Sequence, residues 1–236
     1  MTMPPFGPLQ QLQQRRSLGD QVYYAIREQI VTLQMLPGSM MYENELAEAL
    51  QVSRTPIREA IRLLVSEQLL EVLPQRGTRI ARISVRKVSE ARFIREQLEL
   101  GAFRLAASLW DPQRHAGVQA AAGQLIAEQR EAAAAQDAVR FLQLDEAFHQ
   151  RIIEVTGNTT LLQVIYQMRG HLNRLRCLAM REFATMDRVV KEHEALLEAV
   201  AQGRADQTGI LMEQHLGSLE HEIPQLRSKL PDFFTD

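Results

Sequence analysis

Four residues in the C-terminal half of the chain are of types that bind transition metals: Asp145, His149, His193 and His215. Asp145 and His149 are four positions apart, and side chains at that spacing project from the same side of a helix and can reach one ion. His193 and His215 lie in later segments, each flanked by apolar residues at helical spacing. Helical bundles build metal sites in their cores from such residues. The alternative is that the histidines are ordinary surface or hydrogen-bonded core residues, and the spacing by itself leaves both open.

Helices are the elements that would position these residues. In the segment that holds Asp145 and His149, the apolar residues Phe141, Phe148 and Ile152 mark one buried face. Similar periodicity continues to the C-terminus, interrupted by proline and glycine, and we find no strand pattern there. The sequence therefore predicts an all-α helical bundle, with helices at about 86–108, 113–133, 137–156, 158–182, 186–202 and 204–222.

A second group of residues suited to recognition is a row of arginines near the N-terminus. Arg54, Arg58 and Arg62 are four positions apart and follow one face of a predicted helix. Thr55 and Pro56 are expected at its N-cap and first turn, directly after a shorter helix. A guanidinium group can read guanine O6 and N7 or bind a phosphate. An arginine row at the start of a helix therefore suits insertion into the major groove of DNA.

Two β-prone runs follow the arginine helix, at Leu69–Leu73 and Thr78–Ile83, and they are joined by Pro74–Gly77. Together with a helix predicted at 17–35, they indicate a winged helix-turn-helix domain. The alternative is a helical hairpin whose arginines merely face solvent. That alternative explains neither the wing nor the local charge, since the stretch from residue 54 to 87 holds eight basic and three acidic residues.

Composition and charge are those of a globular protein with one basic region. The net charge is −2, but residues 1–87 hold 11 basic and 8 acidic residues, which leaves 16 and 21 for the remainder. The single cysteine, Cys177, excludes an internal disulfide and fits a reducing compartment. Without a signal-peptide pattern or an apolar run of about 20 residues, we expect a cytoplasmic protein with no membrane partner. Residues 1–16, with three prolines, are predicted to be a flexible arm.

The N-terminal motifs resemble the winged helix of GntR-family transcription regulators. The resemblance is carried by Pro37-Gly38, Leu46-Ala47, the gap-free run from Val52 to Ala60, and Arg76-Gly77. It implies that the DNA-binding residues are Ser53, Arg54, Thr55, Arg58, Arg62, Arg76 and Gly77. One departure is Asn44, which stands where many members carry an arginine. A base or phosphate contact of the family is therefore expected to be missing or altered here.

The C-terminal motifs are similar to the FCD effector domain of FadR-type GntR regulators. They are Phe141-x-x-x-Asp145-x-x-x-His149, Gly157-Asn158, Glu192-His193 with its following apolar residues, and His215-Leu216. In the metal-binding members, one Asp and three His hold a divalent ion at the base of a small-molecule pocket. The resemblance therefore implies that Asp145, His149, His193 and His215 are metal ligands. Three imidazoles and one carboxylate suit zinc, nickel or manganese.

Three arginines are candidates for binding an effector beside that ion, whose remaining positions would suit water or a carboxylate. Arg95 matches the family's Arg-x-x-Leu-Glu pattern, and its guanidinium could pair with an anionic effector. The alternative is a salt bridge with Glu99 at i+4. Arg174 and Arg176 resemble a basic pair of the family, but residues two apart on a helix cannot both face one pocket easily.

These predictions divide the chain into a flexible arm (1–16), a winged helix-turn-helix DNA-binding domain (17–84) and an FCD-like effector-binding and dimerisation domain (85–236). The resemblance implies a homodimeric transcription repressor that binds a palindromic operator in double-stranded DNA and responds to a small-molecule carboxylate effector. One alternative is a metal-dependent hydrolase with an N-terminal DNA-targeting domain. Another is a constitutive DNA-binding protein with an inert bundle.

Overall fold

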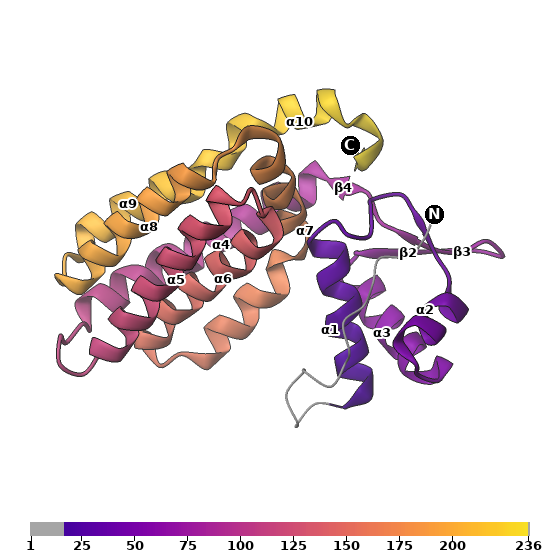
Figure 1. The fold of residues 1–236 in the computed structure, drawn as a ribbon, viewed down its shortest axis with the longest axis horizontal. Helices are drawn as coiled ribbons and strands as arrows, with labels where there is room; N and C mark the ends of the chain where they lie inside the picture. Colours follow the sequence, from indigo (N-terminus) through magenta and orange to yellow (C-terminus); the bar gives the residue numbers. More distant parts are fainter. Residues whose placement is uncertain (1–16, 236) are drawn as a thin grey trace. The chain divides into compact units, whose positions relative to one another are not determined.

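The computed structural model describes residues 17–235, so the predicted arm lies outside the described residues. The chain divides into two compact units (Figure 1). One takes in the chain up to Val85 together with the segment from Lys229, and the other is Arg86–Ser228. The first combines short helices with small sheets, and the second is a bundle of long helices. The predicted fold class, mainly α with an N-terminal winged helix-turn-helix and a C-terminal helical bundle, is confirmed.

The first unit is built on the helices α1 (Leu18–Val31), α2 (Glu43–Leu50) and α3 (Arg54–Ser66). A capping box between Ser17 and Asp20 starts α1 by satisfying backbone N–H groups that have no partner within the helix. The helix ends at Val31, four residues before the predicted end, because Leu33 adopts a left-handed φ of 58°. The core is apolar and fully buried, and includes Val22, Ile26, Ile30, Leu46, Ile57 and Leu64.

The start of α3 differs by two residues from the prediction. Ser53 occupies the N-cap position and Thr55 lies inside the helix, whereas the sequence suggested Thr55 as the cap. Pro56 still falls in the first turn, where backbone N–H groups have no hydrogen-bond partner within the helix, so the N–H group that proline lacks is not missed. Gln51, at a φ of 55°, turns the chain from α2 into α3. The result is two short helices at a tight corner.

A three-stranded antiparallel sheet of order β1-β3-β2 completes the winged helix. The strands β2 (Leu70–Leu73) and β3 (Gly77–Ile80) pair from Leu70 opposite Ile80 to Leu73 opposite Gly77, and form the predicted wing. The strand β1 (Met40–Met41) pairs with β3 and was not predicted, because two residues are too few to show an alternating pattern.

The C-terminus returns to the first unit. The strand β4 (Ile83–Ser84) pairs in parallel with β5 (Phe234–Thr235), next to the short helix η4 (Pro231–Phe233). No strand was predicted after residue 87, and β5 shows that this prediction was wrong. The chain therefore passes between the two units twice, once at Val85 and once at Lys229.

The second unit contains the predicted bundle, with shifts of up to three residues at helix starts. Its long helices are α4 (Val85–Ser108), α5 (Ala116–Ala134), α6 (Ala138–Ile153), α7 (Thr159–Phe183), α8 (Met186–Ala201) and α9 (Ala205–Gly217). The side chains of Asp137 and Asn158 cap α6 and α7. Two predicted helices end in 3₁₀ turns, η2 (Glu154–Thr156) and η3 (Ser218–Glu222), and a further helix, α10 (Ile223–Lys229), was not predicted.

Packing within the bundle brings three of its helices around one interior point. α5 packs against α6 and α8, α8 packs against α9, and α6 packs against α7. The buried faces of α6, α8 and α9 carry Asp145, His149, His193 and His215. Among the described residues, no helix combines the length and apolar character that crossing a bilayer requires.

Candidate functional site

The four predicted metal ligands come together inside the helical unit. Asp145 and His149 project from α6, His193 from α8 and His215 from α9, and one ligand atom from each lies within 4.8 Å of the others. Asp145, His149 and His193 are fully buried and His215 is 6% exposed. The four residues, which we call the Asp/His cluster, form a group that could hold a metal ion.

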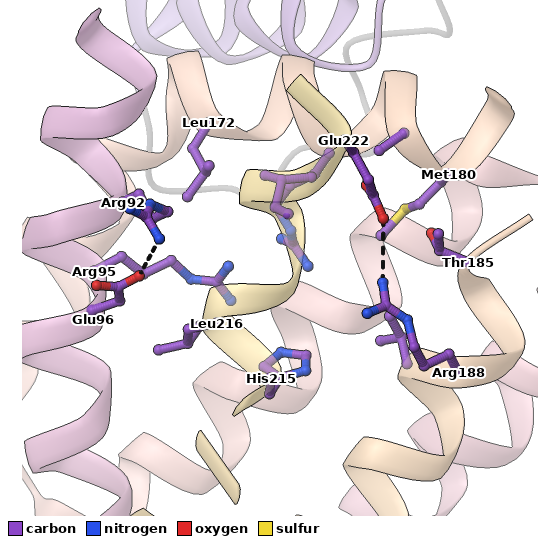
Figure 2. Close-up of a pocket in the computed structure, with 14 residues that line it drawn as sticks. Arg92, Arg95, Glu96, Leu172, Met180, Thr185, Arg188, His215, Leu216 and Glu222 are labelled. Carbon is purple, nitrogen blue, oxygen red and sulfur yellow. Dashed lines mark hydrogen bonds and ion pairs between the residues drawn. The ribbon is translucent and has the colours of Figure 1, made fainter. Parts of the chain in front are cut away.

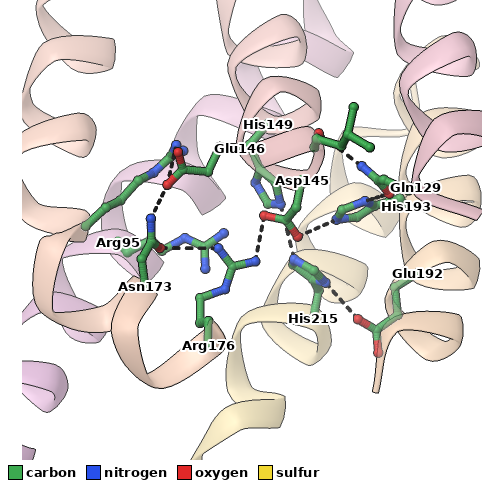
Figure 3. Close-up of polar contacts among 12 residues, drawn as sticks. Arg95, Gln129, Asp145, Glu146, His149, Asn173, Arg176, Glu192, His193 and His215 are labelled. Carbon is green, nitrogen blue, oxygen red and sulfur yellow. Dashed lines mark hydrogen bonds and ion pairs between the residues drawn. The ribbon is translucent and has the colours of Figure 1, made fainter. Parts of the chain in front are cut away.

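Outer contacts orient the three imidazoles of the Asp/His cluster, and Figure 3 shows those of His193 with Gln129 and of His215 with Glu192. Their Nδ1 atoms lie 2.7 Å from Oε2 of Glu99 for His149, 2.8 Å from Oε1 of Gln129 for His193, and 2.7 Å from Oε2 of Glu192 for His215. Gln129 donates its own NH₂ group to the Leu144 carbonyl, so its oxygen is the atom that accepts from His193. An acceptor hydrogen-bonded to Nδ1 of His193 and of His215 favours the tautomer with its proton there and its lone pair on Nε2, whereas Nδ1 of His149 lies at ion-pair distance from Glu99.

The Nε2 atoms face the interior of the cluster. Those of His149 and His215 are 3.2 Å apart, and that of His193 is 3.5 Å from Oδ1 of Asp145. Within the described chain, neither Oδ1 of Asp145 nor Nε2 of His193 has a hydrogen-bond partner, although both are buried. Electron pairs that converge in a dry interior without a donor between them are unfavourable unless a cation binds them. The donor set therefore fits a divalent metal.

Electrostatics favour the protonation states that bind metals. Burial lowers the pKa of His149 to about 4, outweighing the neighbouring carboxylates, and lowers that of His193 well below its ordinary value. Burial by itself would raise the pKa of Asp145, but nearby positive charge, chiefly that of Arg176, outweighs it and holds that pKa well below its ordinary value. At neutral pH, His149 and His193 are thus neutral and Asp145 is ionised, which are the states that bind metals.

The three predicted effector arginines occupy different places. Nε of Arg95 donates to Glu99 at 2.9 Å, which is the salt bridge given above as the alternative to effector binding, while its Nη2 atom is buried with no hydrogen-bond partner in the described chain. Nη2 of Arg176 lies 2.6 Å from Oδ2 of Asp145. Arg174 instead contacts His171 at 2.9 Å and is absent from the cavity that Arg95 and Arg176 border. The structure therefore does not place Arg174 with the other two.

The cavity next to the Asp/His cluster has an enclosed volume of about 40 Å³, and the space around it is about 520 Å³ when the solvent-open mouth is included. Figure 2 shows Arg92, Arg95 and Glu96 of α4 along one wall, Arg188 of α8 on the opposite wall, and His215 between them. Because His215 belongs to the cluster and also borders the cavity, a ligand there would meet both.

Several residues of this site were not identified from the sequence. Glu99, Gln129 and Glu192 orient the imidazoles, while Arg92, Arg188 and Glu222 line the cavity. Two weak signals were available, since Glu99 follows Arg95 by one helical turn and Glu192 directly precedes His193. Gln129 has no local signal, because its partner His193 is 64 positions away.

The predicted DNA-binding side chains lie on the surface of the first unit. Ser53, Arg54, Thr55, Arg58 and Arg62 are exposed along α3, and Arg76 and Gly77 are exposed at the wing. Glu43 of α2 contacts both Arg54, at 2.9 Å, and Arg58, at 3.0 Å. The hydrogen bond from Arg54 is the largest cause, and that from Arg58 the next, of a lowered pKa for Glu43. Asn44, the residue that departs from the family pattern, is also exposed in the first turn of α2.

Comparison with known proteins covers both units. The family of bacterial regulatory proteins called gntR matches residues 18–80, and the FCD domain matches residues 90–218. The chain is 32% identical over 213 residues to an HTH-type transcriptional regulator in an unstable DNA locus of Streptomyces ambofaciens, covering 90% of this chain and 88% of that one. It is 26% identical over 226 residues to the HTH-type transcriptional repressor RspR of Escherichia coli, covering 96% and 97%.

A solved structure agrees on the fold. The structure of E. coli McbR/YncC superposes with a TM-score of 0.78 at 23% identity, over 91% of this chain and 99% of that one. The winged helix, the bundle and the two family matches lead to one conclusion. The chain belongs to the FCD-containing branch of the gntR family of bacterial regulatory proteins, and it is a DNA-binding transcription regulator with a C-terminal domain of the effector-binding type.

Proposed function

We propose that this protein is a homodimeric, metal-containing repressor whose binding to a palindromic operator is changed by a small carboxylate effector. The observation that carries the proposal is the convergence of one carboxylate and three inward imidazoles beside an arginine-lined cavity. That RspR is named a repressor supports the direction of control. A regulator of bacterial genes meets its operator in the cytoplasm, and we propose that location.

Asp145, His149, His193 and His215 would hold the ion, with zinc, nickel or manganese as candidates because of the nitrogen-rich donor set. When bound, the metal supplies a Lewis-acidic position that an effector carboxylate can occupy. The protein residues do the rest. Glu99, Gln129 and Glu192 hold the imidazole rings in place, and Arg176 holds the outer oxygen of Asp145, so that the donor set is organised in advance.

For DNA recognition, we propose that α3 enters the major groove and that Ser53, Arg54, Thr55, Arg58 and Arg62 make its contacts. Arg76 and Gly77 would bring the wing to the neighbouring backbone or minor groove. The exposed ion pairs of Arg54 and Arg58 with Glu43 are worth little in water, so either guanidinium can exchange this partner for a base or phosphate. Two copies of the chain would present two such helices to a two-fold symmetric operator.

Effector binding is proposed to reach the DNA-binding unit along the chain. α4 borders the cavity through Arg92 and Arg95 and follows β4 directly. η3 borders it through Glu222, and the chain then runs through α10 to β5, the partner of β4. Both passages between the units thus start at elements that a ligand would contact. A ligand that prefers one arrangement of these elements would shift the balance between two operator affinities.

A hydrolase remains the main competing class, but the carboxylates around the cluster are poorly placed to act as a general base. Glu99 is fully buried and contacts Arg95, Arg169 and His149. Glu192 contacts His215. Each therefore orients another group. We accordingly propose binding without turnover, with the N-terminal unit acting as a regulator rather than as a targeting module.

The test begins by selecting operator fragments from genomic DNA with purified protein. Fluorescence anisotropy then measures operator affinity for metal-free and zinc-loaded protein with and without a panel of carboxylates, while the same mixtures are assayed for carboxylate consumption. We expect a symmetric operator, and a change in affinity with at least one carboxylate only when metal is present. Consumption of a carboxylate would favour the enzyme, and operator binding that ignores metal and every carboxylate would favour the inert bundle.

Gly77→Val is expected to weaken operator binding roughly tenfold, or about 1.4 kcal/mol. Gly77 has a φ of 103°, and a Cβ there would lie 3.5 Å from Met40 and 3.7 Å from Tyr42. A β-branched residue is strained at this φ and would reshape the wing. Anisotropy on the selected operator measures the effect. Gly117→Ala, where a Cβ meets nothing within 4 Å, is the control. Unchanged affinity for Gly77→Val would remove the wing from the DNA interface.

A further inference from the structure

The cavity beside the Asp/His cluster carries a surplus of positive charge once a divalent ion is present. Five carboxylates near it each contact an arginine, the pairs being Asp145–Arg176, Glu99–Arg95, Glu146–Arg169, Glu96–Arg92 and Glu222–Arg188. A sixth carboxylate, Glu192, contacts His215 and would balance one charge of the ion, so the other charge would have no protein counter-charge. Unbalanced charge in a poorly solvated site is costly, so the site favours an anionic ligand.

One anchor for such a ligand is Arg95. Arg95 is 7% exposed. Its Nε atom donates a hydrogen bond to Glu99, and its Nη2 atom is buried without a hydrogen-bond partner in the described chain. A buried guanidinium N–H left without an acceptor costs free energy that an anionic oxygen in the cavity would recover. Arg176 borders the same cavity, so the first carboxylate would lie close to the Asp/His cluster.

The second anchor is Arg188, on the opposite wall of the cavity (Figure 2). Its contacts are long, 3.4 Å to Glu222 and 3.9 Å to Glu192, and its side chain is 46% exposed. Glu192 is engaged by His215 at 2.7 Å. Arg188 can therefore turn to a ligand at little cost.

The lining of the cavity also includes apolar side chains, among them Leu172, Met180, Val189 and Leu216. An apolar lining suits a short hydrocarbon spacer rather than a polar one. We propose that the effector is a small dicarboxylate, with one carboxylate beside Arg95 and the metal cluster and the other bound by Arg188. This inference rests on the proposed function, since it specifies the effector of the same cavity.

The experiment measures binding of matched ligand pairs to zinc-loaded, full-length protein by isothermal titration calorimetry. Each dicarboxylate from malonate to adipate is compared with the monocarboxylate of equal chain length, such as succinate with butyrate. We expect at least one dicarboxylate to bind the parent protein tenfold or more tightly than its monocarboxylate partner. Arg188→Gln should reduce that ratio to below about threefold while leaving the monocarboxylate affinity unchanged.

Two further variants keep the result interpretable. Arg188→Lys retains the charge and should keep part of the preference. Arg130→Gln removes a surface arginine of α5 that pairs with Glu194 away from the cavity, and it should keep all of the preference. Melting curves confirm that each variant is folded.

Equal affinities within every ligand pair in the parent protein would overturn the dicarboxylate proposal but would still agree with a carboxylate effector. A preference that survives in Arg188→Gln would overturn the second anchor. No binding of any carboxylate would overturn this inference and the proposed effector class together.

Discussion

Replacing His193 and His215 together by alanine is expected to reduce the metal content from about one ion per chain to nearly none. The two residues supply half of the predicted donor atoms, and they come from separate helices, α8 and α9. An Asp and a His on α6 alone would bind a divalent ion only weakly. Elemental analysis of tag-free protein measures the content. His221→Ala, which changes an exposed histidine outside the Asp/His cluster, should leave it unchanged.

Loss of the ion should also lower the stability of the helical unit. A ligand present at a thousand times its dissociation constant stabilises the native state by about 4 kcal/mol, which corresponds to a melting-temperature shift of roughly 10 °C for a protein of this size. The metal-loaded parent should therefore melt about that much higher than the same protein in chelator, whereas the double variant should not respond to chelator. Comparing responses to chelator separates the effect of the ion from the loss of the stacked contact between His193 and Phe148.

The double variant should keep its operator affinity and lose its response to a carboxylate. The first unit has its own apolar core, so α3 and the wing do not depend on the ion. Anisotropy with and without the effector measures both properties. Stoichiometric metal in the double variant would show that the Asp/His cluster is an ordinary buried polar network.

Arg58→Ala is expected to weaken binding to the selected operator by about 1–3 kcal/mol, while binding to unrelated DNA changes little. Arg58 lies one turn into α3 with its side chain 55% exposed, a position from which it can reach a base edge. Its partner Glu43 keeps Arg54 in the variant, and an exposed ion pair of this kind contributes little to folding. The melting temperature should therefore be unchanged.

Anisotropy over a series of salt concentrations measures this effect and separates base recognition from phosphate contact. A base contact lowers affinity for the operator alone, whereas a phosphate contact lowers affinity for all sequences and reduces the salt dependence. We expect the first pattern for Arg58 and the second for Arg62, which lies further from the start of α3. Arg104→Ala, in the other unit, is the control. Parent-like operator binding by Arg58→Ala at every salt concentration would show that α3 does not dock as proposed.

Local patterns in the sequence were sufficient for the helices and the wing. Helical periodicity and the i, i+4 spacing depend on residues within one or two turns, so the pairing of Asp145 with His149 and the exposed row of arginines on α3 could be predicted directly. The helix boundaries were less accurate, because left-handed residues such as Leu33 and short 3₁₀ turns end helices without a distinctive residue type.

Other features depend on partners that are distant in the chain, and only the tertiary structure decided them. The strands β1 and β5 are two residues long and form only because β3 and β4 offer them backbone partners. Arg174 and Arg176 are two apart on α7; Arg174 contacts His171 of its own helix, whereas the packing of α7 against α6 brings Arg176 to Asp145. The direction of each imidazole is set by Glu99, Gln129 and Glu192, which lie on α4, α5 and α8. Residue types thus determined which atoms are available to bind a metal, whereas the packing of α6, α8 and α9 determined that their lone pairs face one point.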